Sequence, residues 1–115
     1  MKVSITMRHQ SLSEELRDLT ERRSQRLVRF EQRLGNVSII FDEEGERSRA
    51  EVRADVAGGS PVVARAGGPT HRTALDRALD RAIRQLKRQR ERRKDHQAPP
   101  PDVVEPDPDA GVPAT

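Results

Sequence analysis

Four short stretches of the chain alternate between apolar and polar residues. Val3, Ile5 and Met7 fall on one side of such a stretch, and Ser4 and Thr6 fall on the other. A period of two is typical of a strand with one buried face. The alternation predicts strands at residues 2–7, 37–41, 50–56 and 62–66.

Two longer stretches repeat apolar residues at helical spacing instead. Ser13 is a suitable N-cap for the first helix, which is expected to continue to about Leu34. Pro69 and Thr70 mark the start of the second helix, which is expected to cover residues 71–96. The predicted buried faces consist of Leu16, Leu19, Leu27, Phe30 and Leu34 in the first helix, and of Leu75, Ala78, Leu79, Ala82, Ile83 and Leu86 in the second.

These elements follow the order β-α-β-β-β-α and predict an α+β fold with two layers. Because each strand has one apolar face, only one side of the sheet needs a cover. We therefore expect a four-stranded sheet with both helices packed on one face. The first two strands flank a helix and are expected to be parallel, whereas the last three are expected to form an antiparallel meander.

Charge is divided unevenly along the chain. All 22 Lys and Arg residues lie in residues 1–96. We expect these residues to form one basic domain, because the chain is too short for a second compact unit. Residues 97–115 are rich in Pro and acids and are expected to be a disordered tail, since they have too few apolar residues to bury. The acids of this tail are Asp102, Glu105, Asp107 and Asp109.

The composition argues against several classes of function. Without cysteine, the chain can form neither disulfides nor Cys-ligated zinc sites, which fits a reducing cytosol. It has no run of about 18 apolar residues and no secretory signal, so we expect a cytoplasmic protein without a membrane partner. His9, His71 and His96 occur singly, and the glycines form no phosphate-binding loop. We therefore predict no metal site, cofactor, small-molecule substrate or catalytic residue, and hence no enzyme.

The second predicted helix is longer than the sheet that it would cover. Residues 71–96 span about 39 Å as a helix, but strands of six or seven residues span only about 20 to 23 Å. The turns after Leu86 are therefore expected to extend beyond the sheet. Arg90 and Arg93 fall there on the arc that was apolar before. The far side of the helix carries a stripe of Arg77, Arg81, Arg84 and Arg88.

The basic residues of both helices form a candidate surface for nucleic acid, because so many like charges repel one another and attract a polyanion. A merely solvated charged face is the alternative. Arg23 interrupts the apolar face of the first helix. Two interpretations are possible: its aliphatic stem is buried along this face, or its guanidinium contacts phosphate. The chain has no Tyr or Trp, so we expect recognition of phosphates and shape rather than base stacking. The predicted RNA-binding residues are Arg22, Arg23, Arg26, Arg29, Arg77, Arg81, Arg84, Lys87, Arg88, Arg90, Arg92, Arg93 and Lys94.

Four segments together resemble the family of ribosome hibernation factors, which includes the hibernation promoting factor and protein Y. The resemblance covers residues 1–96 and implies the fold predicted above. It also implies that Arg23, Arg26, Arg84, Lys87, Arg88 and Arg90 contact RNA. The four segments are RHQSLSEELRD at residues 8–18, the basic set around Arg23 and Arg26, PVVARA at residues 61–66, and residues 73–96.

The resemblance implies a non-enzymatic factor that binds the small ribosomal subunit and its rRNA, blocks the mRNA and tRNA channel, and silences translation in idle or stressed bacterial cells. The chain has no room for the dimerisation domain of the family's long form, and its acidic tail is similar to that of protein Y. This implies a monomer that silences ribosomes without pairing them. Two other hypotheses stay open: a general double-stranded nucleic-acid-binding protein of similar fold, and a structural module whose basic helix docks on an acidic protein.

Overall fold

The predicted order of elements is confirmed. The computed structural model describes residues 1–97, and of these the side chains of residues 1–93. The disordered tail that the sequence predicts falls, from residue 98 onward, outside the described residues. The elements are β1 (Lys2–Met7), α1 (Glu14–Ser24), the 3₁₀ helix η1 (Gln25–Arg29), β2 (Leu34–Glu44), β3 (Arg47–Val56), β4 (Val62–Gly68) and α2 (His71–Gln97).

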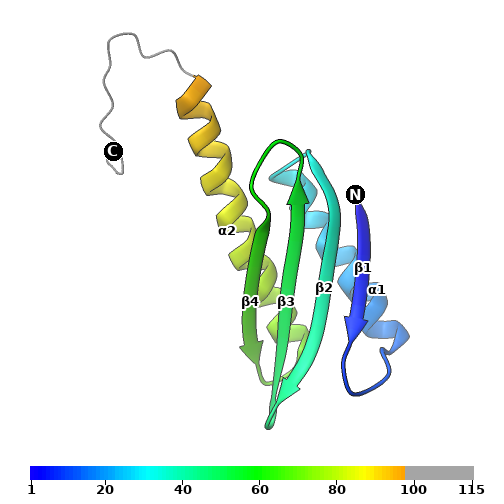
Figure 1. The fold of residues 1–115 in the computed structure, drawn as a ribbon. Helices are drawn as coiled ribbons and strands as arrows, with labels where there is room; N and C mark the ends of the chain where they lie inside the picture. The colour runs from blue at the N-terminus through cyan, green and yellow to red at the C-terminus, as the bar shows by residue number, and fades with distance from the viewer. Residues whose placement is uncertain (98–115) are drawn as a thin grey trace.

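The four strands form one sheet in the order β1-β2-β3-β4 (Figure 1). β1 is parallel to β2, with Ile5 opposite Ile39. β2 and β3 are antiparallel, with Ile39 opposite Val52, and β3 and β4 are antiparallel, with Val52 opposite Ala64. One row of apolar residues therefore crosses the whole sheet, as the alternation in the sequence requires.

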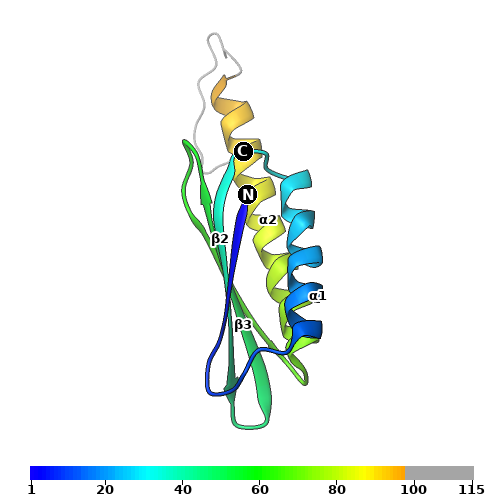
Figure 2. The same ribbon diagram turned by 90° about the vertical axis from the view of Figure 1, so that its right-hand side faces the viewer.

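Both helices lie on one face of the sheet, and the other face is open (Figure 2). α2 packs against β3 and β4, and α1 lies beside α2 on the side of β1. This confirms the predicted two-layer α+β fold. Apolar side chains from both layers are removed completely from solvent: Leu27, Val37, Ile39, Phe41, Val52, Val62, Ala74, Leu75, Ala78, Leu79, Ala82 and Leu86.

The first helix is shorter than predicted. α1 ends at Ser24, η1 continues to Arg29, and Leu34 begins β2 instead of ending a helix. Residues 14–29 span about 24 Å as a helix, close to the roughly 20 Å of β1, whereas a helix reaching Leu34 would span about 31 Å. The chain must therefore leave the helix early to return to the start of β2.

α1 turns small polar residues toward the core. Thr20 and Ser24 are fully buried, although the apolar pattern did not include them. The Thr20 hydroxyl donates to the Leu16 carbonyl at 2.6 Å, and the Ser24 hydroxyl donates to the Thr20 carbonyl at 2.7 Å. Both hydroxyls are thus satisfied inside the helix, which makes their burial tolerable. Of the predicted apolar face, Leu27 is fully buried, whereas Leu16 and Phe30 are only partly covered.

β2 and β4 extend further than the sequence predicts. Gly35, which we expected after the first helix, lies in β2, where the pairing with β3 shifts between Leu34 and Val37. Gly68, two residues beyond the predicted end of the fourth strand, is the last residue of β4. A Cβ atom at Gly68 would lie 3.0 Å from Cγ2 of Thr73, so glycine permits the close approach of β4 to the first turn of α2.

α2 confirms the predicted overhang. Its 27 residues span about 40 Å, and the helix continues past the end of the sheet (Figures 1 and 2). The helix begins as the sequence predicts, because the Thr70 hydroxyl accepts a hydrogen bond from the Thr73 N–H at 3.1 Å. Among the described residues, no helix is long and apolar enough to cross a membrane.

Candidate nucleic-acid interface

One side of α2 is bound to the free edge of β4. Four side chains at intervals of four residues donate hydrogen bonds to main-chain carbonyls of β4 and its preceding loop. The spacings match, because four helical residues rise about 6.0 Å and two strand residues about 6.6 Å. This row covers an edge that would otherwise be open to another strand. The bonds run from Arg77 to Gly67 (2.9 Å), from Arg81 to Arg65, from Gln85 to Val63 (2.9 Å) and from Gln89 to Ser60 (2.7 Å).

A second side of α2 faces α1 and η1 through ion pairs. Arg23 pairs with Asp76, and Arg26 pairs with Asp80 at 3.1 Å. The Arg23 pair is about one-third exposed at each side chain. Arg23 therefore neither simply buries its stem nor points freely at solvent: it joins the two helices. Both arginines remain predicted RNA contacts, but each would have to share its charge with an aspartate.

The connection that follows η1 contacts the end of α2. The Lys87 ammonium lies over the Phe30 ring, 4.9 Å from its centroid. Two turns later, the Arg93 guanidinium donates to the Glu31 carboxylate at 2.6 Å, and the Arg33 backbone N–H donates to the same group at 3.0 Å. Glu31 is 5% exposed. Burial alone would raise the pKa of Glu31, but these two hydrogen bonds and the nearby arginine charges hold it below its usual value.

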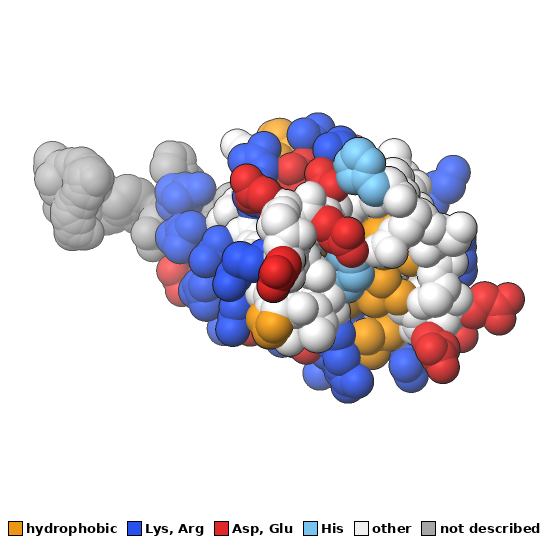
Figure 3. Space-filling model, turned by 90° about the horizontal axis from the view of Figure 1, so that it is seen from below, with side chains coloured by type: hydrophobic (Ala, Val, Ile, Leu, Met, Phe, Trp, Pro, Cys, Tyr) orange, Lys and Arg blue, Asp and Glu red, His pale blue; other side chains and the backbone are white. Residues whose placement is uncertain are grey.

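Five of the remaining predicted residues are exposed and have no internal partner among the described residues. Seen from the lower end of the sheet, Lys and Arg side chains gather along the side that leads to the C-terminal residues (Figure 3). Arg92 has a contact of its own within the molecule, and the side chain of Lys94 lies outside the described part of the chain. Within residues 1–93, the predicted residues that are exposed and have neither an ion pair, a hydrogen bond nor a ring contact from their side chains are Arg22, Arg29, Arg84, Arg88 and Arg90.

The structure also reveals residues that the sequence analysis missed. Gln85 and Gln89 continue the four-residue spacing of Arg77 and Arg81, so this spacing was a usable signal. Glu31 had no local signal, because its partner lies 62 residues away in the chain. Among the described side chains, no group of three or more His, Asp or Glu residues is placed to hold a metal ion.

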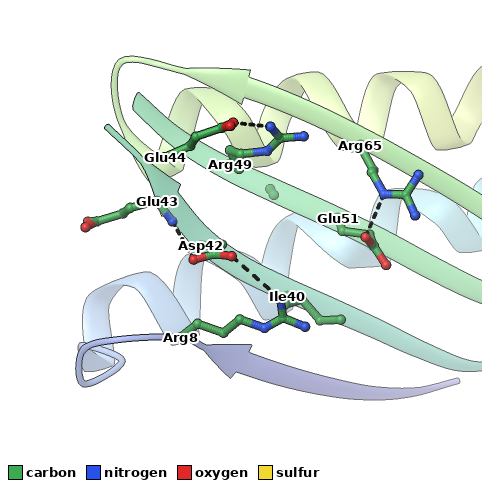
Figure 4. A pocket seen from close by; sticks show the side chains of 9 residues that line it. Arg8, Ile40, Asp42, Glu43, Glu44, Arg49, Glu51 and Arg65 are labelled. Atoms are coloured by element: carbon green, nitrogen blue, oxygen red, sulfur yellow. Dashed lines mark hydrogen bonds and ion pairs between the residues drawn. The ribbon is translucent and has the colours of Figure 1, made fainter. Parts of the chain in front are cut away.

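The open face of the sheet carries arginines that form ion pairs with acidic side chains. Arginines and acids from β2, β3 and β4 line a shallow depression there and bind one another across the strands (Figure 4). Such a face presents little net charge to a polyanion, which makes it a poor phosphate surface. The ion pairs join Arg8 to Asp42 (3.6 Å), Arg49 to Glu44, and Glu51 to both Arg53 and Arg65 (2.8 Å to Arg65).

Glu51 should make folding stability depend on pH. Hydrogen bonds from Arg53 and Arg65 lower the pKa of Glu51 below its usual 4.5, against the opposing effect of burial. A lowered pKa stabilises the folded state above about pH 4.5, and this contribution is lost as the pH falls through the folded value. The stability advantage of wild type over Glu51→Gln, measured by urea unfolding, should therefore shrink between pH 6 and pH 3. The exposed Glu46→Gln is the control; an equal pH trend in both variants would contradict the assignment.

Comparison with known proteins identifies the family of this chain. Residues 3–94 match the family described as Sigma 54 modulation protein / S30EA ribosomal protein. The chain belongs to this family. The family match and the structural neighbours below confirm the resemblance to hibernation factors that was inferred from the sequence. No curated protein sequence matches this S30EA family member significantly.

Two solved structures share the S30EA fold seen here. The crystal structure of the Thermus thermophilus Protein Y N-terminal domain is 27% identical, with a TM-score of 0.69, and the match covers 76% of this chain and 98% of that one. A ribosomal subunit interface protein from Coxiella burnetii is 22% identical, with a TM-score of 0.63, over 83% of this chain and 99% of that one. At 22% identity, the match to the Coxiella burnetii protein shows a shared fold.

Proposed function

We propose that this protein is a ribosome hibernation factor. It binds the small ribosomal subunit through its basic helices, blocks the mRNA and tRNA channel, and silences translation in idle or stressed bacterial cells. It acts in the cytoplasm, as a monomer and without catalysis. Membership of the S30EA ribosomal protein family and the likeness to Protein Y support the ribosome as its partner.

One structural observation carries the helix-led mechanism. Arg49, Arg53 and Arg65 on the open face of the sheet are held by acids, whereas Arg84, Arg88 and Arg90 of α2 are exposed and form no ion pair within residues 1–93. Arg84 and Arg88 are one helical turn apart and point to the same side. A phosphate backbone can neutralise such a row without competing against an internal carboxylate.

The binding should depend steeply on salt. If about five to eight phosphates are neutralised, the logarithm of the affinity should fall against the logarithm of salt concentration with a slope of about −4 to −7. Co-sedimentation of the full chain with purified small subunits at several salt concentrations measures this slope. A slope near zero would contradict binding led by phosphates.

Chemical footprinting of rRNA separates the hypotheses. A hibernation factor should protect nucleotides of the small subunit that line the mRNA and tRNA channel, and should compete there with mRNA. Equal affinity for any RNA or DNA duplex, with protections spread over both subunits, would favour the general nucleic-acid binder. Capture of a protein partner that survives RNase treatment, without any rRNA protection, would favour the acidic-protein hypothesis.

A further inference from the structure

We propose that Glu31 is a positioning residue for RNA binding, although it carries the wrong charge to contact RNA. The proposal rests on the function proposed above. Glu31 holds Arg93 and thereby fixes the end of α2 against the connection between η1 and β2, which passes beside the helix (Figure 2). In this proposal Arg93 does not contact phosphate; it holds in place the end of α2 that carries the exposed Arg88 and Arg90.

The geometry of the Glu31 site is that of an internal clamp. The Glu31 side chain is 4% exposed and the Arg93 side chain 24% exposed. Each carboxylate oxygen has its own donor: Oε1 accepts from Arg93, and Oε2 accepts from the Arg33 backbone N–H. A second guanidinium nitrogen of Arg93, Nη1, is also buried and has no hydrogen-bond partner among the described residues. The guanidinium is therefore turned into the molecule.

The position of Arg93 along α2 gives the clamp its effect. Arg93 lies seven residues after Leu86, so the two share a helical face and are separated by about 10 Å along the axis. Leu86 is fully buried in the core, and Arg93 is anchored by Glu31. The exposed Arg88 and Arg90 lie between these two fixed points. Their spacing is thus set before RNA arrives, in a part of the helix that extends beyond the sheet.

A helix end that leaves its sheet would otherwise fray, because helical turns in water are marginal without tertiary packing. Ordering a flexible helix end and its basic side chains during binding costs free energy. In a helix that is already ordered, this cost falls on folding instead and does not weaken binding. The clamp predicts a result opposite to simple electrostatics. Removing a negative charge near a polyanion site should tighten binding, whereas removing Glu31 should weaken it.

The test compares two charge-equivalent variants of the full chain. Glu31→Gln removes the clamp, and Glu91→Gln removes an exposed carboxylate of α2 that forms no ion pair within residues 1–93. We expect Glu31→Gln to bind small subunits about three- to tenfold more weakly, and Glu91→Gln to bind as well as wild type or tighter. Binding is measured at a temperature where thermal melts show all variants folded. Binding of Glu31→Gln equal to or tighter than that of Glu91→Gln would overturn the proposal.

Two further measurements distinguish positioning from general destabilisation. Amide hydrogen exchange in Glu31→Gln should accelerate over residues 87–93 and stay unchanged in β2 and β3.

Arg93→Gln should weaken binding to a similar extent without changing the salt slope. The double variant should bind no more weakly than either single variant, since both substitutions remove the same contact. A salt slope reduced by one unit in Arg93→Gln would show a phosphate contact instead and would overturn the clamp. Wild type that fails to bind small subunits would overturn the proposed function as well; normal wild-type binding with an unaffected Glu31→Gln would overturn the clamp alone.

Discussion

Replacing Leu79 with alanine should lower the free energy of unfolding by about 2 to 5 kcal/mol. Leu79 has no exposed surface and lies midway along the buried face of α2, in the core cluster that α2 shares with the sheet. Truncation removes buried methyl groups and leaves a cavity. A helix that four hydrogen bonds hold against β4 and its preceding loop cannot close this cavity. Small domains are stable by only about 5 to 15 kcal/mol, so part of the population should unfold. Urea unfolding of the full chain measures the loss.

Val63→Ala is the matched control for this cavity. Val63 is 39% exposed on the open face of the sheet, so its truncation should cost well under the loss at Leu79. The loss of stability in Phe30→Ala should fall between those of the other two variants, because Phe30 is only partly buried and its ring contacts the Lys87 ammonium. Equal midpoints for Leu79→Ala and wild type would mean that the buried face of α2 is wrongly assigned.

Replacing Arg84, Arg88 and Arg90 together with glutamine should reduce the salt slope of ribosome binding by about three units. Near physiological salt this corresponds to a loss of affinity on the order of 100-fold. Stability should hardly change, because glutamine is a good helix former and these side chains form no ion pair within residues 1–93. Co-sedimentation with small subunits at several salt concentrations, together with a thermal melt, measures both quantities.

The control for charge is the triple change of Arg49, Arg53 and Arg65 to glutamine on the open face of the sheet. It removes the same formal charge, but these arginines bind Glu44 and Glu51, so ribosome binding should be nearly unaffected. Should this variant lose binding while the α2 variant keeps it, the open face of the sheet is the binding surface. The mechanism proposed above would then be wrong.

The sequence determined the fold class because its signals are local. A period of two marks one face of a strand and a period near 3.6 marks one face of a helix, whatever the rest of the chain does. The Ser13 and Thr70 caps lie within three residues of the N–H groups that they bind, so both helix starts were predictable. The end of the first helix was not, because the length of β1 and the return to β2 decide it rather than the residues near Leu34.

Only the tertiary structure decided which cations are free. The sequence determined that the helices are basic and that α2 outruns its sheet, since both follow from composition and from the rise per residue. It did not determine that Arg23 meets Asp76 or that Arg93 meets Glu31, because these partners are 53 and 62 residues apart. Ion pairs at such separations depend on which elements lie side by side. A charge becomes a binding site only where the fold leaves it without an internal partner.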